Sequence, residues 1–93
     1  SDPALDLAVV MAVLSSNIDG ALPHDTVFAG EVGLSGEIRA VSRIEQRISE
    51  AEKLGFRQIF VPLGNKKGST KVPQHLEVKF VSKISDICRA LFG

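Results

Sequence analysis

The sequence predicts an α/β (α+β) fold in which three helices pack on one mixed sheet, and three observations predict it. The chain has 93 residues, which fit a single domain over residues 1–93. Hydrophobic residues make up 44% of it and include no Trp or Tyr, so Val, Ile, Leu and Ala must build the core, which suits helices packed on a sheet. From Glu37 onward the hydrophobic periodicity predicts the order strand, helix, strand, strand, helix.

The first predicted helix runs from Pro3 to about Asn17, with Asp2 as its cap and Asp6 in its first turn. Residues 7–14 are all apolar, so we expect other elements to enclose this helix on most sides. The rest of the chain offers few elements that could do so. We therefore expect the domain to lack N-terminal strands, and the open sheet edge to make the chain self-associate.

A hairpin is predicted after this helix. Residues 26–34 and 37–41 flank Ser35-Gly36, which is a signal for a two-residue turn. Gly30 and Gly33 interrupt the first of these runs, and a glycine inside a strand usually marks a bulge or a close backbone approach. We therefore expect a bent hairpin.

A capping box predicts the start of the second helix, because Ser42 can cap it while Glu45 reaches back to the cap. Gly55 is expected to end the helix. An apolar stripe at helical spacing predicts which face is buried. The stripe consists of Ile44, Ile48, Ala51 and Leu54.

The remainder is predicted as strand, loop, strand and helix. Residues 58–63 and 76–81 form the strands, and residues 64–75 form a polar loop between them. Ser82 can cap the last helix. This helix is expected to bury Ile84, Ile87, Cys88 and Leu91.

Composition limits the classes of function. Lys and Arg total 11 and so do Asp and Glu, so the net charge is zero and no global field attracts nucleic acid or acidic lipid. The longest apolar run, Leu7 to Leu14, is far shorter than the roughly 20 residues that span a bilayer. Cys88 is the one cysteine and cannot form an internal disulfide. The sequence therefore predicts an intracellular protein without a membrane partner.

The sequence lacks familiar metal and cofactor motifs. His24 and His75 have no Cys, His or carboxylate at metal-ligand spacing. Residues 30–36 lack the glycine spacing of a dinucleotide loop, and in residues 64–70 the lysines precede the second glycine, whereas in a P-loop the lysine follows it. We predict no metal or cofactor in this domain.

Lys66, Lys67 and Lys71 place three positive charges in the polar loop. Such a loop can follow a phosphate backbone. No aromatic residue neighbours it in the sequence to stack on bases. A solvated surface loop is therefore the alternative to a nucleic-acid contact.

Several motifs resemble those of one known family. They are Asp2-Pro3-Ala4, the segment Ala29 to Arg39 that reads Ala-Gly-Glu-Val-Gly-Leu-Ser-Gly-Glu-Ile-Arg, and the stretches at residues 43–47, 51–56 and 59–62. Together they look like the proteolytic domain of Lon. More closely, they resemble the C-terminal Lon-protease-like domain of the bacterial RadA (Sms) family. The resemblance covers residues 2–65 and implies strands ahead of the first helix.

The resemblance implies that a proteolytic site has been lost. In Lon, a serine at the start of this helix attacks the peptide carbonyl and a lysine at the start of the next helix accepts its proton. Ala4 and Glu45 stand at the matching positions, and alanine has no nucleophilic atom. The alternatives are an active Lon-class serine peptidase that uses another dyad, and a stand-alone protein-interaction domain.

RadA-like identity also implies a role and partners. The domain would be a non-catalytic assembly and DNA-contact module of an ATP-dependent branch-migration protein of homologous recombination and DNA repair. That parent would be a cytoplasmic bacterial DNA-dependent ATPase that forms a ring, a hexamer by resemblance, on branched or single-stranded DNA. ATP, Mg and Zn would belong to its upstream parts. The candidate DNA contacts are Arg39, Arg43, Arg47, Lys66, Lys67 and Lys71. Solvation or ion pairing is the alternative for each.

Overall fold

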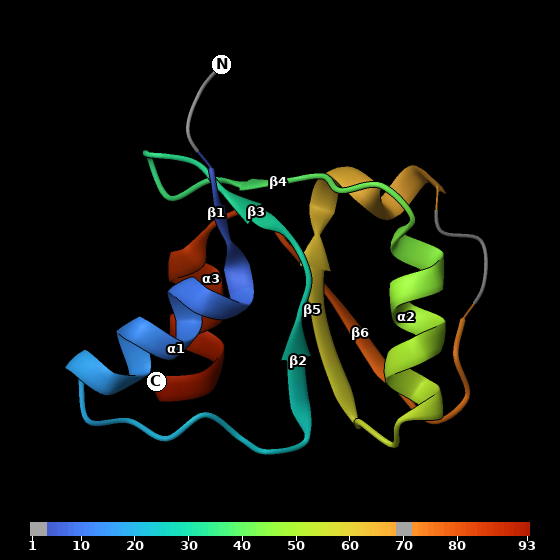
Figure 1. Ribbon diagram of the computed structural model, residues 1–93, viewed down its shortest axis with the longest axis horizontal. Coiled ribbons are helices and arrows are strands. Elements are labelled where there is room, and N and C mark those ends of the chain that lie inside the picture. The colour runs from blue at the N-terminus through green and yellow to red at the C-terminus, as the bar shows by residue number, and fades with distance from the viewer. Residues whose placement is uncertain (1–3, 69–71) are drawn as a thin grey trace.

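The computed structural model describes residues 4–68 and 72–93, and Figure 1 shows their arrangement. This part of the chain forms α-helices and strands, with a 3-10 helix, η1, between the last two strands. In chain order they are β1 (Leu5–Asp6), α1 (Leu7–Asn17), β2 (Thr26–Phe28), β3 (Glu31–Val32), β4 (Ile38–Arg39), α2 (Ile44–Lys53), β5 (Gln58–Pro62), η1 (Leu63–Gly68), β6 (Glu77–Val81) and α3 (Ile84–Phe92). The predicted α/β class is confirmed.

The described strands form two small sheets, so the prediction of one mixed sheet is wrong. One sheet is parallel with the order β2-β5-β6, and the other is antiparallel with the order β1-β3-β4. The chain changes sheets at Gly30, which has φ 153°. Ala29 N still donates to Phe60 O of the parallel sheet, whereas Gly30 O accepts from Leu7 N, at the end of β1. One bend therefore splits the predicted sheet in two.

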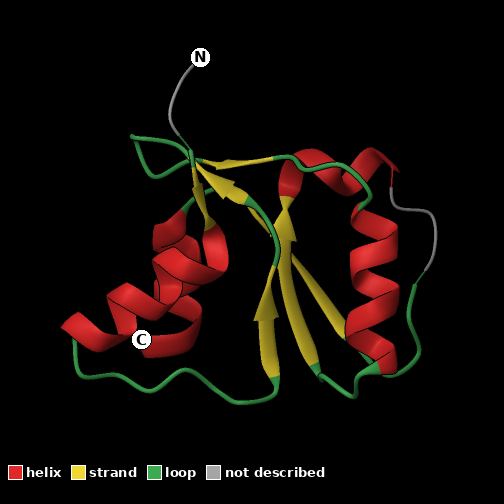
Figure 2. Ribbon diagram, viewed as in Figure 1, coloured by secondary structure: helices red, strands yellow, loops and turns green. Residues whose placement is uncertain are grey.

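Helices cover both faces of the parallel sheet, as Figure 2 shows. Successive side chains of a strand point to opposite faces. Residues of β5 therefore contribute to the apolar clusters on both faces of the parallel sheet. Phe60 packs with Leu7 of α1 and Ile87 of α3, whereas Ile59 and Val61 pack with the buried face of α2. The sheet is thus enclosed between two apolar clusters.

Helix α1 begins four residues later than predicted. Asp6 is its cap, and its carboxylate Oδ1 accepts hydrogen bonds from Ala8 N at 2.9 Å and Val9 N at 3.3 Å. The reason is that Leu5–Asp6 pairs with β3, which holds these residues extended. The predicted cap, Asp2-Pro3, lies outside the described residues.

The prediction that α1 is enclosed on most sides is also wrong for the structure described. Leu7 and Met11 are fully buried, but Val9 is 59% and Val13 is 54% exposed. The sheet and α3 cover one side of the helix and leave the apolar residues of its other side open.

The predicted bend of the hairpin is confirmed, but its two-residue turn is wrong. Gly33 N donates to Glu37 O at 2.9 Å, so three residues form the loop between the paired positions. The last of them, Gly36, has φ 80°, as expected for the left-handed residue that ends a three-residue hairpin loop. The paired strands β3 and β4 are consequently shorter than the predicted runs.

Helix α2 follows the predicted pattern on its buried face but not at its start. Ile44, Ile48 and Ala51 are buried, whereas Leu54 is 75% exposed because it follows the last helical turn. The cap position is Arg43, with φ 58° and no side-chain capping hydrogen bond. The predicted capping box, which would require a cap one residue earlier, is therefore wrong. Gly55, with φ 88°, follows the helix as predicted.

The second half of the chain confirms both predicted strands, but the polar loop between them is partly helical. Its first residues belong to η1. The predicted cap of α3 is wrong by one residue, since Lys83 takes the cap position and Ser82 precedes it. Ile87 of α3 is fully buried, and the rest of its predicted apolar face is partly buried.

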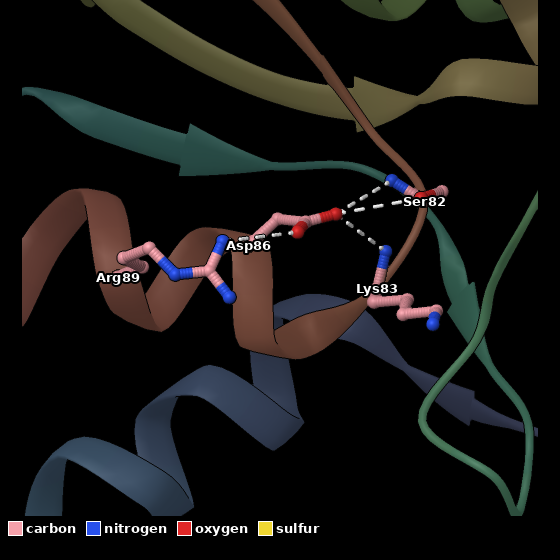
Figure 3. A network of polar contacts seen from close by, with 4 residues as sticks. All are labelled: Ser82, Lys83, Asp86 and Arg89. Atoms are coloured by element: carbon pink, nitrogen blue, oxygen red, sulfur yellow. Dashed lines mark hydrogen bonds and ion pairs between the residues drawn. The ribbon is translucent and has the colours of Figure 1, made fainter.

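A carboxylate organises the start of α3 (Figure 3). Asp86 Oδ2 accepts hydrogen bonds from Lys83 N at 3.2 Å and from Ser82 N and Oγ at 3.4 Å each, and Asp86 Oδ1 lies 3.5 Å from Arg89 Nη1. Burial disfavours the charged carboxylate, but these hydrogen bonds and the Arg89 charge outweigh it and lower the pKa of Asp86. No local motif in the sequence predicts this role of Asp86.

Candidate functional site

The two positions that the resemblance to Lon predicts for a protease dyad lie in different layers of the fold. Ala4 is exposed and leads into β1 of the antiparallel sheet. Glu45 lies in the first turn of α2, on the other side of the parallel sheet from α1. Ala4 offers only a methyl group, so no nucleophile stands at the first position.

Glu45 lines a pocket between α2 and the segment ahead of β6. The pocket has a volume of about 500 Å³, and its walls include Ile48, Ser49 and Glu52 of α2. His75 N donates to Glu52 Oε2 at 2.9 Å, which ties the two walls together. The pocket is therefore lined by two carboxylates, those of Glu45 and Glu52.

Two segments that carry candidate cations are joined by an uncharged residue, Asn65. Its side chain binds the backbone of Val41 twice: Nδ2 donates to Val41 O at 2.8 Å and Oδ1 accepts from Val41 N at 3.0 Å. A Cβ added at Gly64 would lie 3.3 Å from that of Ala40, so the two segments are in close contact. We call this paired contact the Asn65 clamp. It fixes η1 against the connection between β4 and α2, as Figure 1 shows.

Three exposed cations lie on the two segments that the clamp joins. Lys66 and Lys67 belong to η1, and Arg43 caps α2 two residues after Val41. Lys66 Nζ also lies 5.8 Å from the centre of the Phe80 ring, a cation–π distance that positions this side chain. We call Arg43, Lys66 and Lys67 the basic ridge. A helix N-terminus adds partial positive charge beside it.

Arg39 is not part of the basic ridge, because its side chain forms an ion pair within the hairpin. Its Nη2 lies 3.1 Å from Glu37 Oε2, and Ser35 N donates to Glu37 Oε1 at 3.1 Å. Hydrogen bonds from the backbone of Glu37 itself, and then from Arg39, lower the pKa of the Glu37 carboxyl. Arg39 is half-buried in this ion pair and is a poorer candidate for a phosphate contact.

The remaining candidates are less well placed. Arg47 is exposed one turn after Arg43, and it lines a shallow groove between α2 and β2. Lys71 lies outside the described residues. The structure therefore places three of the six predicted cations on the two segments that the Asn65 clamp joins.

Sequence reasoning missed Asn65. Its partner is 24 residues away, and neither residue carries a charge or a catalytic group that would draw attention to it. A Gly-Asn pair before two lysines was the available signal, but it reads equally well as an ordinary turn.

The described residues contain neither a metal-ligand cluster nor a helix that could span a membrane. In residues 4–68 and 72–93, His, Cys, Asp and Glu form no group of three that could hold a metal ion. Over the same residues, every helix is too short or too polar to cross a bilayer.

Comparison with known proteins places the chain among bacterial relatives. Residues 1–65 match the family model described as subunit ChlI of Mg-chelatase. The chain is 46% identical over 92 residues to DNA repair protein RadA of Bacillus subtilis (strain 168), a match that covers 99% of this chain and 20% of that protein. For RadA of Streptococcus pneumoniae the identity is 46%, with 99% and 22% covered. For RadA of Listeria monocytogenes it is 48%, with 91% and 18% covered. The chain spans about a fifth of the length of these relatives.

Proposed function

The chain belongs to the family described as subunit ChlI of Mg-chelatase, and from its RadA relatives we propose that it is a DNA-contact and assembly module of a longer DNA repair protein. The module is Lon-like and non-catalytic. The parent protein is an ATP-dependent branch-migration protein of homologous recombination, and this module supplies surface while other parts supply the motor.

The basic ridge is the observation that carries the DNA-contact proposal. The Asn65 clamp joins the segment that carries Lys66 and Lys67 to the segment that carries Arg43, so the three exposed cations lie on two segments held in contact. Cations that neutralise phosphates release condensed counterions, which gives affinity without reading sequence. Because the net charge of the chain is zero, the chain as a whole has no electrostatic field that attracts DNA. Attraction of DNA would therefore depend on a local group of cations such as the basic ridge.

Loss of proteolysis follows from the Lon-like assignment. The nucleophile position holds Ala4, which has no atom that can attack a carbonyl, and the base position holds Glu45 in place of lysine. The parent should therefore leave a fluorogenic peptide intact. Turnover that survives Ala4→Gly but is lost on substitution of one serine would instead support a peptidase with another dyad.

Assembly and cofactors belong to the parent. We propose that it forms a ring of identical subunits, a cytoplasmic bacterial hexamer, on branched or single-stranded DNA. ATP, Mg and Zn would bind in other parts of the parent, as the resemblance to RadA implies. Deletion of this domain from the parent should abolish ring formation or stimulation on branched DNA. Retention of both would contradict the assembly role.

The DNA-contact role is tested in the full-length parent. The variant Arg43→Gln/Lys66→Gln/Lys67→Gln removes the basic ridge, and Lys53→Gln/Arg57→Gln/Lys83→Gln removes three exposed cations elsewhere as a matched control. Fluorescence anisotropy with branched DNA at fixed salt should give about a tenfold or greater rise in Kd for the ridge variant and little change for the control. Equal Kd values for the two variants would contradict the proposal.

A further inference from the structure

Strand β6 lies at the opposite edge of the parallel sheet from β2. Glu77 N donates to Arg57 O, just ahead of β5, at 2.9 Å, so the N–H and C=O of Glu77 point toward β5. Because these groups alternate sides along a strand, the N–H and C=O of Val78 and Phe80 point away from it. Among the described residues, no strand pairs with that side of β6. This side of β6 can therefore receive another strand.

The hairpin determines where this open edge ends. Ile38 N of β4 donates to Ser82 O at 2.9 Å, so the outward-pointing carbonyl directly after β6 is already used. Glu37 and Lys83 bridge the same two segments one residue further along. The edge is thus open along β6 itself and closed beyond it. A strand that pairs here must be short and must stop opposite Phe80.

Two opposite charges lie side by side on this edge. Lys79 Nζ lies 3.9 Å from Glu77 Oε1, and the two side chains are 39% and 66% exposed. Lys79 Nζ also lies 5.7 Å from the centre of the Phe60 ring, so both charges are on the face of the sheet where α1 and α3 pack. Strong charged hydrogen bonds have lengths of about 2.7–2.9 Å, so this ion pair is loose. Each charge can therefore meet a further group of opposite sign.

The other face of the same edge is apolar. Val78 and Phe80 pack against the cluster beneath α2 but are only partly buried. Leu76, directly before the strand, is buried in that cluster. A strand paired along β6 would cover the exposed parts of Val78 and Phe80 if it presented apolar side chains on this face.

We propose that β6 pairs with β6 of a second copy of this chain, antiparallel and about a two-fold axis at Val78. This axis places Glu77 of each chain opposite Lys79 of the other. It also places Phe80 of each chain opposite Leu76 of the other. Opposite charges and apolar pairs directly across an antiparallel ladder stabilise it. Val78 meets its own copy as a hydrogen-bonded pair, because its N–H and C=O point outward.

The charges and the hairpin together select this register. An axis at Glu77 or at Lys79 would place like charges opposite each other, which destabilises an antiparallel pair. An axis at Phe80 would place Val78 opposite Ser82, whose carbonyl the hairpin already uses. The axis at Val78 avoids both conflicts.

A second copy fits this edge better than an unrelated strand does. Another protein would have to present a cation and a carboxylate at the two complementary positions, whereas a two-fold axis supplies both from the chain itself. Such a contact is isologous, but a ring of identical subunits uses head-to-tail contacts. The β6 contact is therefore distinct from the ring contact, and neither one requires the other.

Charge reversal in the 93-residue chain tests the proposal. Lys79→Glu places carboxylates opposite carboxylates, and Glu77→Lys places ammonium groups opposite ammonium groups. Each variant alone should therefore dimerise about tenfold or more weakly than wild type. A mixture of the two variants restores opposite charges and should form a mixed dimer with a Kd close to that of wild type. Sedimentation equilibrium measures these Kd values. Glu50→Lys and Lys53→Glu, at exposed positions of α2, are matched controls and should leave the Kd unchanged.

Three results would overturn the proposal. The first is a wild-type chain that stays monomeric up to about 1 mM. The second is association that neither charge variant weakens, because it would assign the contact to another surface, such as the exposed face of α1. The third is a mixture that associates no better than its two components. None of these results depends on DNA binding by the basic ridge.

Discussion

The side chain of Asn65 replaces a strand partner for Val41. It meets both backbone groups of that residue at hydrogen-bond distances of 2.8 and 3.0 Å. The same contact holds the connection ahead of α2 in place, which explains how Arg43 can occupy the cap position at φ 58° without a capping side chain. A tertiary contact here outweighs the local preference for a serine cap.

Replacement of Asn65 by alanine should destabilise the domain. Both bonds would be lost and the partly buried backbone of Val41 left unsatisfied, so we expect the free energy of unfolding to fall by about 1–3 kcal/mol. Urea denaturation measures this change. Asn17→Ala, at the exposed end of α1, is the matched control and should have a smaller effect. Equal losses for the two variants would show that the Asn65 clamp does not stabilise the fold.

Asp86 should make stability depend on pH in the acid range. Its pKa is lowered in the folded protein, so its contribution is fully present above the unfolded pKa of about 3.9 and is lost as the pH falls through the lower folded value. Melting temperatures of wild type and Asp86→Asn should therefore differ most above about pH 4 and converge in stronger acid. A difference that stays constant with pH would contradict this assignment. Glu37, whose pKa is also lowered, leaves a residual acid dependence in both proteins.

At the scale of the elements, the sequence predicted what local periodicity controls. The buried face of α2 and the position of Gly55 follow from 3.6-residue spacing and from the left-handed conformation that glycine favours. The start of α1 could not be predicted from local sequence, because Leu5–Asp6 pairs with β3 and this pairing overrides the capping signal at Asp2. Pairing partners are distant in sequence, so such overrides are not visible locally.

Substitution by alanine at two positions of the predicted α2 stripe should lower the free energy of unfolding by very different amounts. Ile48 is 5% exposed and packs under the sheet, whereas Leu54 is 75% exposed. Ile48→Ala should lower the free energy of unfolding by about 2–5 kcal/mol, and Leu54→Ala should change it by about 0.5 kcal/mol or less in the 93-residue chain. Urea denaturation distinguishes them. Similar losses would mean that Leu54 is packed rather than exposed.

For the whole molecule, zero net charge hides a local concentration of cations. The sequence identified all six candidates as single residues, but only the fold selects among them. Arg39 forms an ion pair within the hairpin, whereas the segments that carry Arg43, Lys66 and Lys67 are joined by the Asn65–Val41 contact, which no charge pattern reveals. The likeness in sequence supplied the proposed partner, DNA, and the geometry supplies the surface.

The salt dependence of DNA binding by the full-length parent tests the central claim most directly. Each phosphate contact adds about 0.9 to the slope of log K against log salt on duplex DNA. If Arg43, Lys66 and Lys67 contact phosphates, their replacement by glutamine should reduce the slope by about 2 to 3, while Lys53→Gln/Arg57→Gln/Lys83→Gln leaves it unchanged. An unaltered slope in the ridge variant would contradict the account.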